Sequence, residues 1–363
     1  MMTPFTARDG ENLALYEWPL DDASTLSATR HGGDRDSASG SPDRVRGMVL
    51  IVHGLGEHAL RYEHVAAALM RWGFVVRAFD LRGHGRSGGE RGQVPTESAL
   101  LDDLAEIVED AVLRCQRLGA AQARSAGADQ ARSAGADQAE EPGHAAAAPR
   151  FKVPLILLGH SLGGLLASRI VSMNLFPVDG LVLSSPALDA GFSRWQKLLL
   201  AVLPKLLPDL VINNGLDARY LSRDPAVVAR YRADDLVHTR ISLRLGQFIV
   251  NASQATMAAA VHWHTPTLLM YAGADRLVSP AGSATFANRA ATSPHVKPGT
   301  VTVRCFGEHY HELFNELESA AVFSELGSWL DVKFKANQSP AQQVRAQADP
   351  EFIASLAWLP TLP

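Results

Sequence analysis

Residues 155–168, LILLGHSLGGLLAS, decide the fold because they join a strand pattern to a helix pattern through one sharp turn. The first four residues form a continuous apolar run, as in a strand that is buried on both faces. After the turn, apolar residues recur at helical spacing. The five residues from Gly159 to Gly163, GHSLG, fit the pattern G-x-S-x-G in the strand-to-helix context that this pattern requires. The stretch therefore predicts a strand, a tight turn at Ser161 and a helix.

The rest of the chain alternates between the same two patterns. Short apolar runs are separated by amphipathic stretches with glycine or proline at their ends. This alternation predicts an α/β fold with a mostly parallel, doubly wound central sheet flanked by helices. We expect strands at 47–54, 74–80, 153–161, 180–186, 265–273 and 299–307, and helices at 62–73, 98–118 and 162–174, from 279 onward and at 313–332.

Three parts of the chain depart from this rhythm. Residues 21–46 and 119–150 are polar and low in complexity, and the second holds ARSAGADQ twice in tandem. We expect both to be surface insertions that form loops without chemistry. Residues 187–265 hold helix-like pieces and no convincing strand, so they predict a helical cap. The hydrolase core would then comprise 1–186 and 266–335, followed by a tail at 336–363.

Composition and charge exclude several classes of protein. The formal net charge is −4, which gives no reason to expect a nucleic-acid partner. Two cysteines, Cys115 and Cys305, cannot build a disulfide framework and are expected to be buried thiols. The N-terminus lacks the pattern of a secretory signal, and no apolar run is long enough for a membrane span. We expect a cytoplasmic protein, at most peripheral at a membrane. The oligomeric state is left open.

Ser161 is the candidate nucleophile. A sharp turn of this kind forces strained backbone angles on the serine and needs small neighbours so that strand and helix can approach. The helix that follows contributes its positive end and the N–H of Leu162 where negative charge develops. The alternative is a tight turn with an inert serine.

A serine hydroxyl needs a base and an orienting acid. Asp275 follows the expected strand at 265–273, at the carboxyl edge where catalytic groups gather. It competes with Asp189 at the mouth of the cap, and with a purely turn-forming role. His309 and His311 both follow the last expected strand, and position alone does not decide which of them is the base.

The stretch 53–58, HGLGEH, leaves a strand at the same edge. Its glycine-rich backbone can direct the Leu55 N–H at the serine, so that Leu55 and Leu162 together supply an oxyanion hole. A phosphate-binding loop is the alternative, but the chain lacks the full nucleotide-binding patterns. Two H-x-H pairs, at His262 and His309, have no nearby set of further ligands. We expect no metal and no cofactor.

Several long stretches resemble the monoacylglycerol lipase and lysophospholipase family of serine α/β-hydrolases. They are HGLGEH from His53, FDLRGHGRSGGERG from Phe79, GHSLGG from Gly159, YLSRDPAVVARYRADDLVH from Tyr220, AGADRLVSP from Ala272 and YHELFNE from Tyr310. The resemblance implies catalytic roles for Ser161, Asp275 and His311, and favours His311 over His309. It also implies Leu55 and Leu162 as oxyanion donors. Many members carry Met at the position of Leu162, a difference that leaves a backbone role intact.

Within the expected cap, Trp195, Leu199 and Leu203 belong to an apolar stripe at helical spacing. The stripe either packs on the core of the cap or lines an acyl tunnel or touches a lipid surface. The resemblance favours the second interpretation. It implies a lipid ester as substrate and a transient contact of the cap with a membrane or micelle.

We therefore expect a serine hydrolase that cleaves carboxylic esters of lipids, monoacylglycerols or lysophospholipids, through an acyl-enzyme. A thioesterase or acyltransferase would use the same three residues. A binding protein with this fold would keep the pocket without turnover. A dehalogenase or epoxide hydrolase is disfavoured because its nucleophile at position 161 would be Asp.

Overall fold

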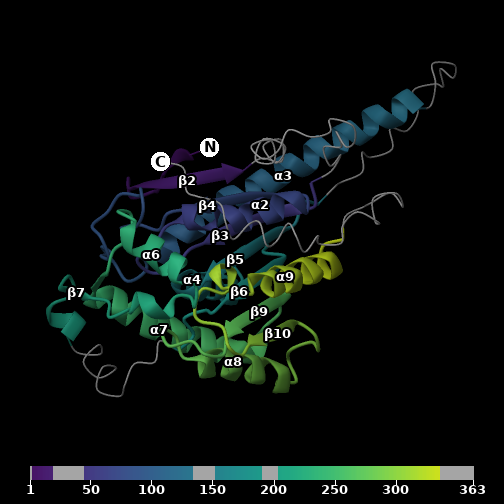
Figure 1. Ribbon diagram of the computed structural model, residues 1–363. Coiled ribbons are helices and arrows are strands. Elements are labelled where there is room, and N and C mark those ends of the chain that lie inside the picture. The colour runs from purple at the N-terminus through teal and green to yellow at the C-terminus, as the bar shows by residue number, and fades with distance from the viewer. Residues whose placement is uncertain (1, 19–44, 134–151, 190–202, 336–363) are drawn as a thin grey trace.

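The computed structural model describes residues 2–18, 45–133, 152–189 and 203–335, and eight strands in them form one sheet (Figure 1). The strand order is β1-β2-β4-β3-β5-β6-β9-β10, and the six strands from β4 to β10 run parallel. The predicted mostly parallel sheet is confirmed, with every expected strand in place. The bounds are β1 Met2–Thr6, β2 Asn12–Trp18, β3 Gly47–Val52, β4 Phe74–Phe79, β5 Leu155–His160, β6 Gly180–Ser184, β9 Thr267–Ala272 and β10 Val301–Phe306.

Helices cover both faces of this sheet. Side chains of a strand point alternately to opposite faces, so Leu50 packs with one layer of helices and Ile51 with the other. The layer on the Leu50 face holds α3 (Ala99–Ser133), α4 (Ser161–Met173) and α8 (Pro280–Thr292). The layer on the Ile51 face holds α2 (Glu63–Arg71) and α9 (Ser319–Lys333). A sheet buried on both faces explains the continuous apolar runs of its central strands.

The first two strands, β1 and β2, are not among the expected ones. They form an antiparallel hairpin, and β2 extends the sheet by pairing antiparallel with β4, Leu15 opposite Phe79. The edge strand is β1, whose residues alternate between exposed and half-buried, so it lacks a continuous apolar run. In β2, Leu13–Tyr16 are buried and apolar, and this strand was missed in the sequence.

The segment between β6 and β9 is named here the cap segment, and it has a helical part at one end of the sheet (Figure 1). Its described elements are β7 (Val211–Asn213), η3 (Ala218–Tyr220), α6 (Pro225–Ala233), β8 (Arg240–Ser242), α7 (Leu243–Ala259) and η4 (Ala260–His262). The expectation that it holds no strand is wrong, because β7 and β8 pair antiparallel outside the main sheet. Strands of three residues are too short to leave a periodic signal. The domain boundaries themselves stay a prediction.

The structure describes residues 119–133 of the second predicted insertion and only the last two residues of the first. Residues 119–133 were expected to be a loop, but α3 continues through them to Ser133, so that prediction is wrong. Alanine, arginine and glutamine are strong helix formers, and this propensity outweighs the low complexity of the repeat. Residues 19–44 and 134–151, which hold almost all of the remainder, lie outside the described residues.

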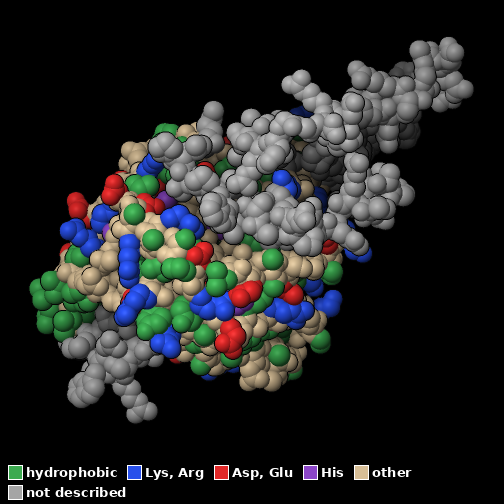
Figure 2. Space-filling model, in the orientation of Figure 1, with side chains coloured by type: hydrophobic (Ala, Val, Ile, Leu, Met, Phe, Trp, Pro, Cys, Tyr) green, Lys and Arg blue, Asp and Glu red, His purple; other side chains and the backbone are tan. Residues whose placement is uncertain are grey.

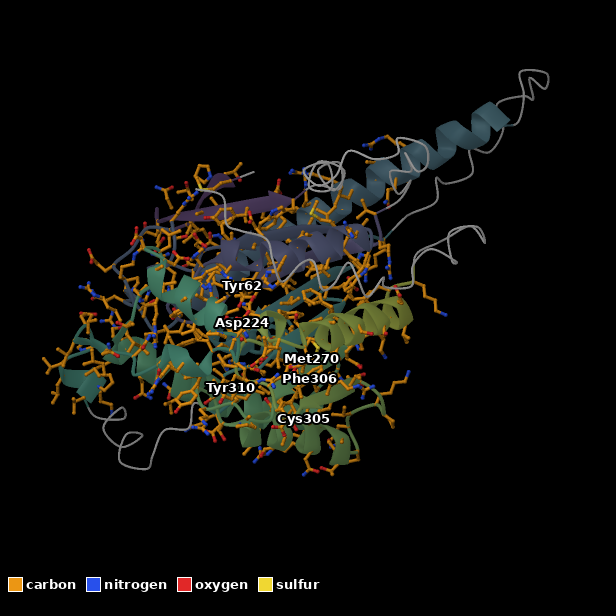
Figure 3. The ribbon with its side chains drawn as sticks, in the orientation of Figure 1. Tyr62, Asp224, Met270, Cys305, Phe306 and Tyr310 are labelled. Carbon is orange, nitrogen blue, oxygen red and sulfur yellow. The ribbon has the colours of Figure 1, made fainter. Side chains whose placement is uncertain are left out.

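The expectation of two buried thiols holds for Cys115 and is wrong for Cys305. Cys115 is buried, whereas Cys305 is exposed on the edge strand β10, where Figure 3 labels it beside Phe306. No helix in the described parts of the chain combines the length and the apolar character that crossing a bilayer requires.

Candidate active site

Ser161 stands where β5 ends and α4 begins, and its backbone φ is +51°. A positive φ strains a residue that carries a side chain. Glycines on either side permit the turn. A Cβ on Gly163 would lie 2.1 Å from the carbonyl oxygen of Val52, and one on Gly159 would lie 2.5 Å from the carbonyl oxygen of Gly163. The G-x-S-x-G pattern therefore reflects backbone contacts that leave no room for a side chain.

Asp275 and His311 form a buried pair. Asp275 follows β9, His311 follows β10, and the His311 Nδ1 lies 2.6 Å from the Asp275 Oδ2. The other carboxylate oxygen, Oδ1, accepts the backbone N–H groups of Leu277 at 2.8 Å and Val278 at 3.0 Å. Since the carboxylate can only accept, Nδ1 carries the hydrogen. A neutral His311 then has Nε2 as its basic nitrogen.

The pair shifts the pKa of both members. Burial lowers the pKa of His311, but the charge and hydrogen bond of Asp275 outweigh it, so the net pKa is above the ordinary histidine value. Burial raises the pKa of Asp275, but His311 and the two backbone N–H groups bring the net value below the ordinary one. Asp275 thus stays ionised while it stabilises a charged imidazole.

The His311 ring lies against the residue that precedes the serine. The centroids of the His160 and His311 rings are 4.7 Å apart. His160 is buried, and burial followed by the charge of His311 lowers its pKa to about 4, so it is uncharged near neutral pH. The chain thus brings Asp275 and His311 to the same edge of the sheet as Ser161.

The two rivals lie elsewhere. The ring of His309 packs on Phe306, with centroids 5.1 Å apart, and its Nε2 is buried without a partner among the described residues. Asp189 accepts the Ser279 N–H at 3.0 Å through its backbone carbonyl. Asp275 is therefore the carboxylate that contacts His311, and His311 rather than His309 is the histidine that contacts it.

The HGLGEH loop packs directly on the serine. A Cβ on Gly54 would lie 3.2 Å from the Ser161 Cβ, and 2.8 Å from the Oε1 atom of Glu57. Glu57 Oε1 accepts the Gly54 N–H at 2.6 Å and the hydroxyl of Tyr62, labelled in Figure 3, at 2.8 Å. Leu55 follows Gly54 in this loop, and Leu162 is the second residue of α4. Their roles as oxyanion donors remain a prediction.

Sequence reasoning missed a buried ionic network beside this site. Arg61 forms an ion pair with Glu57 and donates two parallel hydrogen bonds of 2.7 Å to Glu312. Both carboxylates are buried, and the guanidinium lies 4.8 Å from the centroid of the Tyr231 ring. Both acids are present in the quoted motifs, HGLGEH and YHELFNE. The arginine that joins them could not be identified, because 251 residues separate it from Glu312.

Of the apolar cap residues, Trp195 and Leu199 lie outside the described residues, and Leu203 is half-buried. Next to Leu203 lies an apolar group that we name the cap-edge patch. It consists of Leu206, Leu207, Leu210 and Ile212, exposed by 75, 53, 44 and 48%. Figure 2 shows hydrophobic side chains gathered over the β7 end of the molecule.

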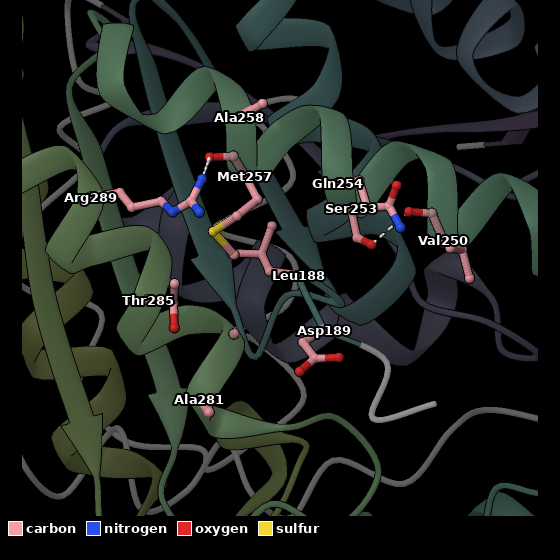
Figure 4. A pocket seen from close by; sticks show the side chains of 11 residues that line it. Leu188, Asp189, Val250, Ser253, Gln254, Met257, Ala258, Ala281, Thr285 and Arg289 are labelled. Atoms are coloured by element: carbon pink, nitrogen blue, oxygen red, sulfur yellow. Dashed lines mark hydrogen bonds between the residues drawn. The ribbon is translucent and has the colours of Figure 1, made fainter. Parts of the chain in front are cut away.

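A cavity of about 350 Å³ lies between α7 and α8 (Figure 4). Its wall includes Leu188, Val250 and Met257, and Arg289 donates a hydrogen bond of 3.2 Å to the Met257 carbonyl. The ring of His262, from one of the H-x-H pairs, is tilted against the ring of His295, with centroids 4.9 Å apart. In the ranges that the structure covers, no group of three or more His, Cys, Asp or Glu is arranged to hold a metal ion.

Comparison with known proteins places this geometry in context. A family model described as serine aminopeptidase, S33, matches residues 43–154 and 143–318. The monoacylglycerol lipase of Mycolicibacterium smegmatis is 33% identical over 288 residues, covering 78% of this chain and 88% of that protein. Phospholipase YtpA of Bacillus subtilis is 27% identical over 293 residues, covering 80% of this chain and 96% of that protein. The crystal structure of Paleococcus ferrophilus monoacylglycerol lipase matches with a TM-score of 0.64 and 30% identity, covering 80% of this chain and 96% of that one. These matches confirm the predicted α/β-hydrolase fold.

Proposed function

Since the chain belongs to the serine aminopeptidase S33 family of α/β-hydrolases, we propose that it is a serine hydrolase that cleaves carboxylic esters of lipids, monoacylglycerols or lysophospholipids. It is related to monoglyceride lipases and to a phospholipase. One observation supports the proposal: the buried Asp275–His311 pair lies at the same edge of the sheet as a serine held at a positive φ, with the His311 ring against the residue that precedes this serine.

In the proposed reaction, His311 Nε2 accepts the Ser161 hydroxyl proton as the oxygen attacks the ester carbonyl carbon. The carbonyl electron pair moves to oxygen, and the N–H groups of Leu55 and Leu162 bind this oxyanion. The oxyanion then collapses, the bond to the alcohol oxygen breaks, and the imidazolium protonates the leaving alcohol. An acyl-enzyme on Ser161 remains.

Water completes the cycle by the same steps. His311 takes a proton from water, the hydroxide attacks the acyl carbonyl, and the Ser161 oxygen leaves with the proton from His311. Asp275 keeps its negative charge throughout and stabilises the imidazolium. The raised pKa of His311 fits this role, because the charged form is favoured where it must exist transiently.

The substrate class rests on two supports. The first support is that the two relatives above with 30% identity or more are both named monoacylglycerol lipase. The second is that the cap-edge patch exposes apolar side chains on the cap segment. A patch of this kind suits the surface of a micelle or bilayer. We therefore include in the proposal a transient contact of this patch with lipid.

The decisive test replaces the nucleophile. Ser161→Ala is expected to lose at least about 10³-fold in kcat on monoacylglycerol while its unfolding temperature stays close to that of the unchanged protein. Reaction of the unchanged protein with a fluorophosphonate should label Ser161. Near-normal turnover by Ser161→Ala would sink the mechanism, and no labelling would favour a binding protein of this fold.

A substrate panel separates the remaining possibilities. Initial rates on monoacylglycerols, lysophosphatidylcholines and acyl thioesters of matched chain length identify the preferred leaving group. Adding an alcohol acceptor and measuring the new ester distinguishes transfer from hydrolysis. A preference of more than tenfold for thioester, or for transfer over release of free acid, would replace the proposed ester hydrolase.

The lipid contact has a matched control on the same chain. Leu206→Asp with Leu207→Asp changes the cap-edge patch, whereas Leu113→Asp changes an exposed leucine on α3. The first variant is expected to lose sedimentation with phosphatidylglycerol vesicles and turnover of vesicle-borne monoacylglycerol, but to keep turnover of a soluble short-chain ester. Equal effects of both variants would contradict a role for the patch.

A further inference from the structure

The histidine loop, residues 307–318, connects β10 to α9 and carries His311. A base on a loop is placed only as well as the loop backbone is held. On the core side, Arg61 holds Glu312, and the His64 Nε2 donates to the Phe314 carbonyl at 3.2 Å. These contacts fix one side of the loop.

The other side is held by the cap segment. We name Tyr220–Arg223 the cap strap, which runs along the histidine loop just before α6 begins. The His311 N–H lies 3.4 Å from the Tyr220 carbonyl, and the Glu312 N–H donates to the Leu221 carbonyl at 2.8 Å. The hydroxyl of the next strap residue, Ser222, donates to the Asn315 carbonyl at 2.8 Å. The backbone that carries the base thus rests on the cap.

The carboxylate of Glu316 contacts both the histidine loop and the cap strap. The side chain of Glu316 is fully buried, and its Oε1 accepts the Tyr310 N–H at 2.7 Å and the Arg223 N–H at 3.1 Å. Its Oε2 accepts from the Arg223 guanidinium Nε at 2.9 Å. Figure 3 labels Tyr310 in the loop and Asp224, the residue that follows the strap. Glu316 therefore ties the residue before His311 to the cap strap.

The guanidinium of Arg223 has a second partner of another kind. Its Nη2 donates to Glu318, whose side chain is 59% exposed. An exposed ion pair contributes little to holding a backbone, since water and salt screen it. A buried carboxylate that accepts several N–H groups is far stiffer, because each unmade bond would leave a desolvated group without a partner.

We propose that Arg223 and Glu316 are positioning residues for the His311 base, so that the cap segment sets the geometry of the proton transfer. The proposal rests on the proposed serine hydrolase function. It assigns neither residue a contact with the substrate. A displacement of the reacting groups by about 1 Å can cost about 100-fold in rate. Loss of the Glu316 contacts is expected to reduce kcat by about 30- to 100-fold.

The central experiment compares Glu316→Gln with its matched control, Glu318→Gln. Both replace a glutamate partner of Arg223 in the same loop, but only the first sets a donor against a buried donor. Both Glu316 oxygens accept N–H groups, so the NH₂ group of Gln must face either the Arg223 Nε or the Tyr310 and Arg223 backbone N–H groups. Glu316→Gln is expected to lose kcat and the rate of fluorophosphonate labelling together, with KM unchanged within about threefold. Glu318→Gln should keep both rates. Equal losses, or no loss in Glu316→Gln, would overturn the proposal.

Two further readouts separate positioning from loss of structure. If the loop relaxes and His311 draws away from Asp275, the midpoint of the acid limb of kcat/KM should move to lower pH in Glu316→Gln. Arg223→Ala removes the guanidinium and keeps the buried carboxylate, so it should show a smaller loss of about 5- to 20-fold. If Glu316→Gln does not fold, Arg223→Ala decides, and wild-type kcat in that variant would refute the pair.

A measurement that needs no turnover distinguishes this proposal from the function on which it rests. The ¹H–¹⁵N spectrum of the histidine side chains reports the Nδ1–H bond of His311, which His311→Gln identifies. If the unchanged protein neither hydrolyses esters nor labels, the proposed function fails. A His311 signal that shifts in Glu316→Gln and stays in Glu318→Gln still supports positioning, and a signal unchanged in both contradicts it.

Discussion

Asp275→Asn tests the site most sharply, because the structure determines how the new amide must point. The Asp275 Oδ1 accepts two backbone N–H groups, from Leu277 and Val278. Only the amide oxygen of Asn can take over that role. The amide NH₂ must then face the Nδ1 atom of His311, where the carboxylate Oδ2 lay at 2.6 Å. Since NH₂ is a donor, Nδ1 must become the acceptor.

The magnitude follows from this reversal. A neutral His311 that accepts at Nδ1 carries its hydrogen on Nε2, so the nitrogen intended for Ser161 can no longer take a proton. The negative charge that stabilises the imidazolium is lost as well. In the general Ser-His-Asp scheme, this wrong tautomer lowers kcat by about 10⁴-fold, which corresponds to about 5.4 kcal/mol in the activation free energy.

The assay measures kcat and KM on a soluble ester, with the unfolding temperature as a check on the fold. We expect Asp275→Asn to lose about 10⁴-fold in kcat, with KM within about threefold and the fold intact. Asp189→Asn is the matched control, since it makes the same change in the rival acid. A loss of less than about tenfold in Asp275→Asn, or a larger loss in Asp189→Asn, would refute the assignment.

Three other predictions concern the same site. The His311 pKa lies above the ordinary value of 6.5 and the neutral form is the base, so kcat/KM should fall tenfold per pH unit below a midpoint above pH 6.5. A midpoint below 6.5 in a pH–rate profile would contradict this. Gly54→Ala places a Cβ 2.8 Å from Glu57 Oε1 and 3.2 Å from the Ser161 Cβ, so it should displace the HGLGEH loop and, if Leu55 donates to the oxyanion, lower kcat by about 10- to 100-fold in a folded protein. Gly163→Ala would bring a Cβ to 2.1 Å from a backbone oxygen, so chemical denaturation should show a loss of more than about 3 kcal/mol in the free energy of unfolding; a loss below about 1 kcal/mol would show that the turn tolerates a side chain.

The sequence predicted the parallel strands because burial on both faces demands continuous apolar runs, as in β5 and its neighbours. It failed where burial is partial or elements are short. The alternating exposure of β1 and the three residues of β7 and of β8 carry no such signal. The alanine-rich repeat gave the opposite error: its low complexity predicted a loop, but its high helix propensity extends α3 to Ser133.

For the site, chain order and strand ends were enough to select Ser161 and Asp275 as candidates. They could not choose between His309 and His311, because both histidines lie on the loop that follows β10 and so are placed at the same edge of the sheet. The difference lies in which ring the loop turns toward the carboxylate, and the loop is shaped by distant partners. Those partners, Arg61 and Arg223, are visible only in three dimensions.

Arg61 and Arg223 each contact the histidine loop, Arg61 through Glu312 and Arg223 through Glu316. A buried ion pair offers little net stability, since the cost of desolvating both charges offsets most of their attraction. The consequence of these pairs is therefore chiefly geometric. Arg61 joins the histidine loop, through Glu312, to Glu57 in the HGLGEH loop of the core, and Arg223 joins it, through Glu316, to the cap strap. His311 lies between two anchors on different parts of the molecule.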